Sequence, residues 1–246
     1  GFTHVHWCHH WNTDFMYSAP EVSQIQDWLA DLGLKVTDIH ASAGREKGWA
    51  SALEYERLAG VQLVANRLEM AARLGADVAV LHLPGEPEAE ADRVAYWDRI
   101  RLSLDVLGLH SQATGVRIAF ENGGTPASWT PLARILGEYG PDFVGLCYDS
   151  GHGNISGDGL DQLARHADRL IAIHLHDNEG ASDQHAMPFT GTVDWDRLAR
   201  LIAASGYDKW VNLELSQARS GYEDETVFLH DALAAAERLT EAIAAG

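Results

Sequence analysis

Short apolar segments alternate with longer helical patterns along the whole chain, and this alternation limits the possible folds more than any other feature. The segments that predict strands are residues 2–7, 35–39, 77–81, 116–120, 143–148, 170–173 and 210–213. Strands and helices that alternate in this way predict a parallel sheet with helices packed outside it. Both faces of such a sheet are buried, which fits the apolar composition of these segments.

The helical stretches between the strands share an amphipathic pattern. They span residues 19–32, 58–74, 91–114, 131–139, 194–204 and 224–244. Several of them stop at a glycine shortly before the next strand, namely at Gly33, Gly75, Gly115 and Gly206. Glycine is the residue that most often ends a helix in the left-handed conformation. The repeated strand–helix unit therefore predicts an α/β barrel.

We expect the chain to form one domain, residues 1–246, because this length is ordinary for an α/β barrel. A closed (β/α)8 barrel has eight strands, whereas seven are recognisable here. The chain begins at Gly1 with a strand almost at once. We therefore expect that the first βα unit is missing from this sequence; the alternative is a barrel that closes with seven strands.

The composition excludes several classes of function. The chain has 18 Lys and Arg residues against 36 Asp and Glu, a formal net charge of −18, which disfavours nucleic acid and anionic membranes as partners. No apolar run approaches the ~20 residues of a membrane span, and no signal peptide is recognisable. Cys8 and Cys147 are the only cysteines, so we expect no disulfide framework and a cytoplasmic protein. Cys147 is expected to be a small buried side chain.

Ionisable side chains gather where the apolar strands end, and the chain contains thirteen histidines. The residues at or just after these strand ends are His40, His82, Glu121, Asp149, His152, His174, His176 and Glu214. In a parallel barrel the carboxyl ends of all strands meet at one rim, so these side chains are expected to converge. A single histidine or glutamate at a strand end is usually a structural residue, but six coincident strand ends indicate a shared polar site.

A shared site of this composition needs a cation. Three carboxylates at contacts of ~4 Å repel one another by about 4 kcal/mol per pair at an effective dielectric constant of 20. Imidazole with carboxylate is the ligand set expected for Zn, Mn, Co or Fe, whereas Mg and Ca sites rely on oxygen ligands. Asp183 and His185 also indicate a metal site, because in extended backbone their side chains would point the same way and could bind one ion together. The alternative is that Pro188 and Trp195 alone anchor this loop.

Four motifs make the chain recognisable. Tyr-Asp-Ser-Gly-His at 148–152, His-Leu-His-Asp-Asn at 174–178, Gly-Thr-Val-Asp-Trp at 191–195 and Leu-Glu-Leu at 213–215 resemble the xylose isomerase-like TIM barrels. This superfamily holds sugar isomerases, epimerases and the endonuclease IV group. The resemblance implies that the catalytic metal is held by Glu121, Asp149, His174 and Glu214. His174 is preferred over His176 because it begins the family's His-x-x-acid pattern, which Asp177 completes; His176 stays open as a ligand and is otherwise expected to bind substrate.

The endonuclease IV relatives bind three zinc ions through five further ligands. The resemblance places their counterparts at His40, His82, His152, Asp183 and His185, so it implies a capacity for one to three divalent ions. The loops after Glu121 and Glu214 are short and carry no basic segment, which disfavours duplex DNA as the substrate.

Two chemistries remain open. The first is a metal-dependent isomerase or epimerase of a sugar or sugar-like polyol, in which Glu121 and Glu214 act as the acid/base pair, as the resemblance implies. Its pocket wall could come from Trp7, Trp11, Phe15, Tyr17, His9 and His10, and we expect His9, His10 and Trp11 to contact substrate; packing of a long loop is the alternative for these residues. The second is a zinc phosphoesterase acting on a small phosphoester. A non-catalytic barrel is disfavoured because both glutamates are present. The expected partner is a small-molecule substrate, for which a carbohydrate is the first expectation, and a homo-oligomer is compatible with the sequence.

Overall fold

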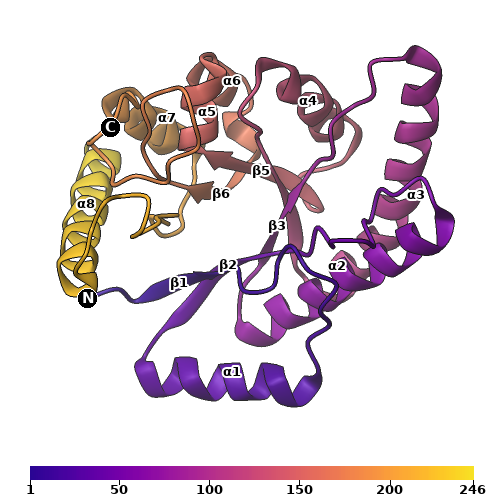
Figure 1. Cartoon of the computed structure of the whole chain (residues 1–246), viewed down its shortest axis with the longest axis horizontal. Coiled ribbons are helices and arrows are strands. Elements are labelled where there is room, and N and C mark those ends of the chain that lie inside the picture. The colour runs from indigo at the N-terminus through magenta and orange to yellow at the C-terminus, as the bar shows by residue number, and fades with distance from the viewer. The chain divides into compact units, whose positions relative to one another are not determined.

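The structure is a computed structural model that describes residues 1–246, and the chain divides into two compact units (Figure 1). The first, here called the N-terminal unit, comprises Thr3–Phe120 and Asp142–Val144. The second, the C-terminal unit, comprises Gly1–Phe2, Glu121–Pro141 and Gly145–Gly246. Each unit is described by itself.

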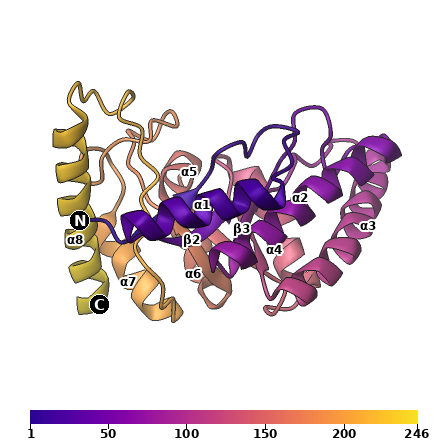
Figure 2. The same cartoon turned by 90° about the horizontal axis from the view of Figure 1, so that it is seen from below.

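The N-terminal unit contains four neighbouring strands and three long helices. The strands are β1 (His4–Trp7), β2 (Lys35–His40), β3 (Val78–His82) and β4 (Arg117–Glu121), in the order β1-β2-β3-β4; the last residue of β4 belongs to the C-terminal unit. The helices are α1 (Ala19–Leu32), α2 (Glu54–Leu74) and α3 (Glu90–Thr114). β1 and β2 are parallel, as are β2 and β3, and α2 packs against α3 (Figure 2). The predicted alternation of strand and helix is confirmed here.

The C-terminal unit continues the same alternation and adds several short helices. They are η1 (Pro126–Ser128), α4 (Trp129–Glu138), β5 (Val144–Asp149), α5 (Ser150–Ser156), α6 (Gly159–Arg165), η2 (Ala167–Arg169), β6 (Leu170–His174), α7 (Trp195–Ser205) and α8 (Glu225–Ala245). β5 and β6 are parallel, with Asp149 level with His174. α5 packs on α6, α6 on α7 and α7 on α8.

The helix ends follow the predicted glycine signals. Gly33, Gly75, Gly115 and Gly206 end α1, α2, α3 and α7 with φ angles of 66°, 81°, 72° and 78°. These are left-handed conformations, which glycine adopts without steric cost. A single local residue type therefore sets where four of the helices stop.

The strand expected over residues 210–213 is not formed. This segment makes one isolated parallel bridge, between Leu175 and Leu213. The Leu175 N–H donates to the Asn212 carbonyl and the Glu214 N–H donates to the Leu175 carbonyl, at 2.9 and 3.1 Å. Residues 210–213 pair with the neighbouring segment at one bridge only, which is too short for a strand, and Trp210 is exposed. The structure thus has six strands, and Glu214 is positioned by a bridge.

The strands are buried on both faces, as predicted for a parallel sheet. Val78, Ala79, Val80 and Leu81 are consecutive and all 0% exposed, although successive strand residues point to opposite faces. In the C-terminal unit, Cys147 is likewise fully buried, as expected. Burial of apolar side chains along each strand leaves the strand ends as the places for polar residues. None of the helices combines the length and apolarity that a membrane span requires.

Candidate metal centre

Four predicted ligands lie together in the C-terminal unit. Glu121, Asp149 and His174 are the last residues of β4, β5 and β6, and Glu214 follows the bridge at Leu213. Glu121 is 4% exposed, and Asp149 and His174 are 0% exposed. One ligand atom from each of the four side chains lies within 4.8 Å of the others. The structure therefore brings together the four residues that the sequence analysis grouped.

His174 lies between the two glutamates. Its Nδ1 atom is 3.3 Å from Glu121 Oε2 and 3.2 Å from Glu214 Oε2. The Glu121 side chain is almost completely buried, whereas that of Glu214 is 24% exposed. Two carboxylates thus approach one imidazole nitrogen, and one of them remains accessible to a small molecule.

Asp149 has a structural role beside its predicted role as a ligand. It is the N-cap of α5, and its Oδ1 accepts the His152 N–H at 2.7 Å. His176 Nε2 lies 3.1 Å from the same carboxylate. Gly151 makes this approach possible, because a Cβ at that position would lie 1.9 Å from His176 Cε1. His174, the last residue of β6, and His176, two residues beyond it, are both fully buried, with His174 at the glutamates and His176 at Asp149.

The second predicted group, His152, Asp183 and His185, also converges. Asp183 Oδ2 lies 2.9 Å from His185 Nε2 and 3.7 Å from His152 Nε2. The His185 ring stacks on His176 with 4.1 Å between ring centroids. The sequence analysis expected Asp183 and His185 to lie in extended backbone. His185 instead has a φ angle of 49°, which is a left-handed conformation. An irregular loop with a left-handed residue at His185 brings the side chains together.

Carboxylates and histidines in this cluster shift one another's pKa values. Burial opposes the charged form of His152, but the charges of Asp149, Asp183 and Glu121 outweigh it and raise its pKa to about 11. Burial likewise opposes ionisation of Asp183, yet the nearby His152 and the hydrogen-bonded His185 hold the pKa of Asp183 well below the usual range. The cluster is therefore strongly negative and stabilises positive charge within it.

This negative charge and the donor set fit a divalent metal. Glu121, Asp149, His174 and Glu214 offer three carboxylates and one imidazole, which are ligands for Zn and for other first-row metals. Cys147 Sγ also lies within 4.8 Å of ligand atoms of Glu121 and His174. Sequence reasoning missed this proximity, although Cys147 and Asp149 are two residues apart on one strand and so share a face.

Asp177 organises the loop that follows β6, a role that the sequence analysis also missed. This fully buried carboxylate accepts the N–H groups of Asn178 and Val193 at 2.9 and 3.2 Å and the Trp195 Nε1–H at 2.8 Å. A Cβ on Gly191 would lie 2.4 Å from Asp177 Oδ1. The Gly-Thr-Val-Asp-Trp motif thus wraps around one carboxylate, which fixes the two ends of the loop that carries Asp183 and His185.

The remaining predicted residues belong to the N-terminal unit. The His40 and His82 rings stack at 5.0 Å with an angle of 5° between their planes, and Trp11 lies 4.7 Å from His40 and 5.4 Å from His82. The ring centroids of His9 and His10 lie 4.0 Å apart. The roles of His40 and His82 as ligands, and of His9, His10 and Trp11 toward substrate, remain predictions.

The aromatic loop of the N-terminal unit is held from within. Arg67 is 0% exposed, and its Nη2 donates to the carbonyls of His10 and Phe15 at 3.3 and 2.9 Å. Its guanidinium lies over the Tyr17 ring, 4.5 Å from the centroid. Loop packing, the structural alternative for these aromatic residues, therefore accounts for part of this cluster.

Comparison with known proteins agrees with this architecture. A profile of the family described as xylose isomerase-like TIM barrel matches residues 1–236. The uncharacterized protein y4fM of Sinorhizobium fredii is 34% identical over 99% of this chain and 86% of its own length. Inosose dehydratase of Lacticaseibacillus casei is 29% identical over 49% of this chain and 47% of its own length.

Solved structures show the same fold. A D-tagatose 3-epimerase-like protein has a TM-score of 0.76 and 20% identity, covering 99% of this chain and 89% of that chain. The IolI protein with a binding zinc atom has a TM-score of 0.70 and 17% identity, covering 99% of this chain and 88% of that chain.

Proposed function

Since the chain belongs to the xylose isomerase-like TIM-barrel family, we propose that it is a divalent-metal-dependent isomerase or epimerase that acts on a sugar or sugar-like polyol. The observation that carries this proposal is the convergence of Glu121 and Glu214 on His174, beside the buried carboxylate of Asp149. The names of two relatives, an inosose dehydratase and a D-tagatose 3-epimerase-like protein, support a carbohydrate-like substrate.

In this proposal Glu121, Asp149, His174 and Glu214 hold the metal, which would be Zn, Mn, Co or Fe. When bound, such an ion polarises the carbonyl and hydroxyl oxygens of a substrate. The neighbour that binds zinc supports this assignment.

The two glutamates would move the proton. One carboxylate takes the proton from the carbon next to the substrate carbonyl, and the other returns a proton to the opposite face of that carbon, which inverts it. Return of the proton to the neighbouring carbon would instead give an isomerase. Glu214 is the better candidate for first contact with substrate because its side chain is the more exposed of the two. Burial of Glu121 and His174 would keep bulk water from competing for the proton.

Glu214→Gln tests this role. The substitution keeps the shape of the side chain but removes its charge and its basicity, so turnover of ketose sugars should fall by roughly 10²–10⁴-fold. Circular dichroism should show an unchanged fold. Glu223→Gln, at an exposed position, is the matched control and should keep full activity. Unchanged turnover in Glu214→Gln would exclude the proposed acid/base pair.

A second candidate, a zinc phosphoesterase, is favoured by one observation: Asp183 lies between His152 and His185. The test is the double substitution Asp183→Ala with His185→Ala, assayed on ketose sugars and on a generic phosphodiester. Loss of phosphodiester hydrolysis would support the hydrolase. Retained sugar turnover with about one metal per chain, measured by elemental analysis, would support the isomerase or epimerase.

A further inference from the structure

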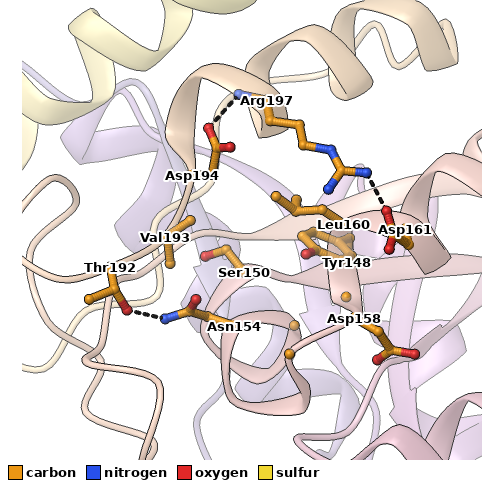
Figure 3. Close-up of a pocket in the computed structure, with 13 residues that line it drawn as sticks. Tyr148, Ser150, Asn154, Asp158, Leu160, Asp161, Thr192, Val193, Asp194 and Arg197 are labelled. Atoms are coloured by element: carbon orange, nitrogen blue, oxygen red, sulfur yellow. Dashed lines mark hydrogen bonds and ion pairs between the residues drawn. The ribbon is translucent and has the colours of Figure 1, made fainter.

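A pocket of about 130 Å³ lies in the C-terminal unit, between α5, α6 and the start of α7 (Figure 3). None of the four proposed metal ligands lines it. Tyr148 does, and it precedes Asp149 on β5. Successive strand residues point to opposite faces, so the pocket and the candidate metal centre lie on opposite sides of this strand.

A tyrosine that is almost completely buried, Tyr148, lines this pocket. Tyr148 is 1% exposed, and its hydroxyl group makes no hydrogen bond within the chain. The hydroxyl lies against the backbone of Gly153, another lining residue, where an added Cβ would be 2.3 Å from Tyr148 Oη. Buried polar groups in native proteins are nearly always satisfied by protein, water or ligand. This hydroxyl is therefore available to bind a water molecule or a ligand in the pocket.

Other polar groups around the pocket keep free donors and acceptors. Arg197 uses Nη2 to bond Asp161, which leaves its Nε and Nη1 without hydrogen bonds. Asp194 accepts the Arg197 N–H with Oδ1 at 2.9 Å, and its Oδ2 is unbonded. Asn154 donates its amide group to Thr192 Oγ1 at 2.9 Å, and its carbonyl oxygen is unbonded (Figure 3). The walls thus present donors and acceptors together.

The chemistry and size of the pocket define the class of its occupant. Hydroxyl groups both donate and accept, so adjacent hydroxyls match a mixed wall of this kind. The lining residues include three aspartates, Asp158, Asp161 and Asp194, and one arginine, Arg197, and this balance of charge disfavours an anion. Since one water takes up about 30 Å³ of liquid volume, the pocket holds about four waters or one glycerol-sized molecule.

We propose that this pocket is a second site, which binds a small polyhydroxylated molecule of about three or four carbons through the Tyr148 hydroxyl, Asn154, Asp194 and Arg197. The proposal does not rest on the proposed catalytic function, because the pocket lies apart from the proposed ligands.

Titration of the ¹⁵N-labelled full chain with glycerol or erythritol, followed by NMR, tests this site. Saturable shifts are expected for backbone amides of residues 153–161 and 192–197, with a dissociation constant on the order of millimolar for so small a ligand. The shifts should be the same with and without bound metal. 1-Propanol, which has one hydroxyl group, should bind more weakly than glycerol.

Three variants make the test specific. Tyr148→Phe removes only the hydroxyl and should weaken glycerol binding by roughly two- to tenfold. Leu160→Trp, which fills the pocket from its rim, should abolish it. Tyr222→Phe, at a tyrosine outside the pocket, is the matched control and should bind like the parent protein.

Several results would overturn the proposal. Chemical shifts that do not saturate, or equal glycerol binding by Tyr148→Phe and the parent protein, would each contradict it. Tighter binding of n-propylammonium than of glycerol would make this a cation site. Glycerol binding that requires the metal would place the ligand at the metal centre.

Discussion

Asp177 illustrates how much one buried carboxylate can determine at the scale of a single residue. Its hydrogen bonds to Asn178, Val193 and Trp195 join the two ends of the loop after β6. Trp195→Phe removes one donor to a buried charge and should lower the free energy of unfolding by roughly 1.5–3 kcal/mol. Chemical denaturation measures this directly.

The matched control for that prediction is Trp28→Phe, because Trp28 is 55% exposed on α1. Its effect should stay within about 0.5 kcal/mol, as for most surface substitutions. Equal effects of the two substitutions would mean that the Trp195 hydrogen bond adds nothing to stability.

At the scale of the element, α1 begins with a capping box that depends on pH. The Ser18 hydroxyl and backbone N–H both donate to Glu21 Oε2, at 2.7 and 2.8 Å. These hydrogen bonds, that of the Ser18 side chain first, lower the pKa of Glu21 from its ordinary value of 4.5. A carboxyl group whose pKa is lower in the folded state stabilises the fold above its unfolded pKa, and this contribution is lost as the pH falls through the folded pKa.

Ser18→Ala should therefore destabilise the protein by about 1 kcal/mol at pH 7. The loss should be smaller at acidic pH than at pH 7, because Glu21 takes up a proton as the pH falls through its lowered folded pKa and then no longer accepts these hydrogen bonds. Urea unfolding at both pH values measures the difference. Ser18→Thr, which keeps a capping hydroxyl, should behave like the parent protein, and a cost that does not change with pH would contradict the capping box.

At the scale of the whole molecule, the candidate metal centre should link stability to metal concentration. An ion that binds only the folded chain adds about 2.7 kcal/mol at one hundred times its Kd. For a protein of this length, each kcal/mol raises the unfolding midpoint by about 2–4 °C. We therefore expect thermal unfolding to shift upward with Zn or Mn and to return after chelation.

The same shift should be much smaller in Glu214→Gln, which lacks one charged ligand, and unchanged in Glu223→Gln. A full shift in Glu214→Gln would place the metal elsewhere. This measurement does not depend on knowing the substrate, so it tests the metal centre separately from the reaction.

Features that depend on neighbouring residues could be predicted from the amino-acid sequence. The strand–helix alternation, the helix ends at Gly33, Gly75, Gly115 and Gly206, and the polar residues at strand ends all follow from local conformational preference and from burial. Because parallel strands point the same way, the sequence also grouped Glu121, Asp149, His174 and Glu214, which the structure places within 4.8 Å of one another. That they bind a metal remains a prediction.

Features that depend on contacts between distant residues became visible only in the folded structure. Residues 210–213 look like a strand, yet Leu213 pairs only with Leu175. The short helix α5 carries Gly151 and Gly153, which disfavour helix in isolation but are required here by the close approach of His176 and Tyr148. His174 and His176 are only two residues apart, yet His174 contacts the two glutamates and His176 contacts Asp149. Local pattern cannot encode such choices, because the atoms that make them lie far away in the chain.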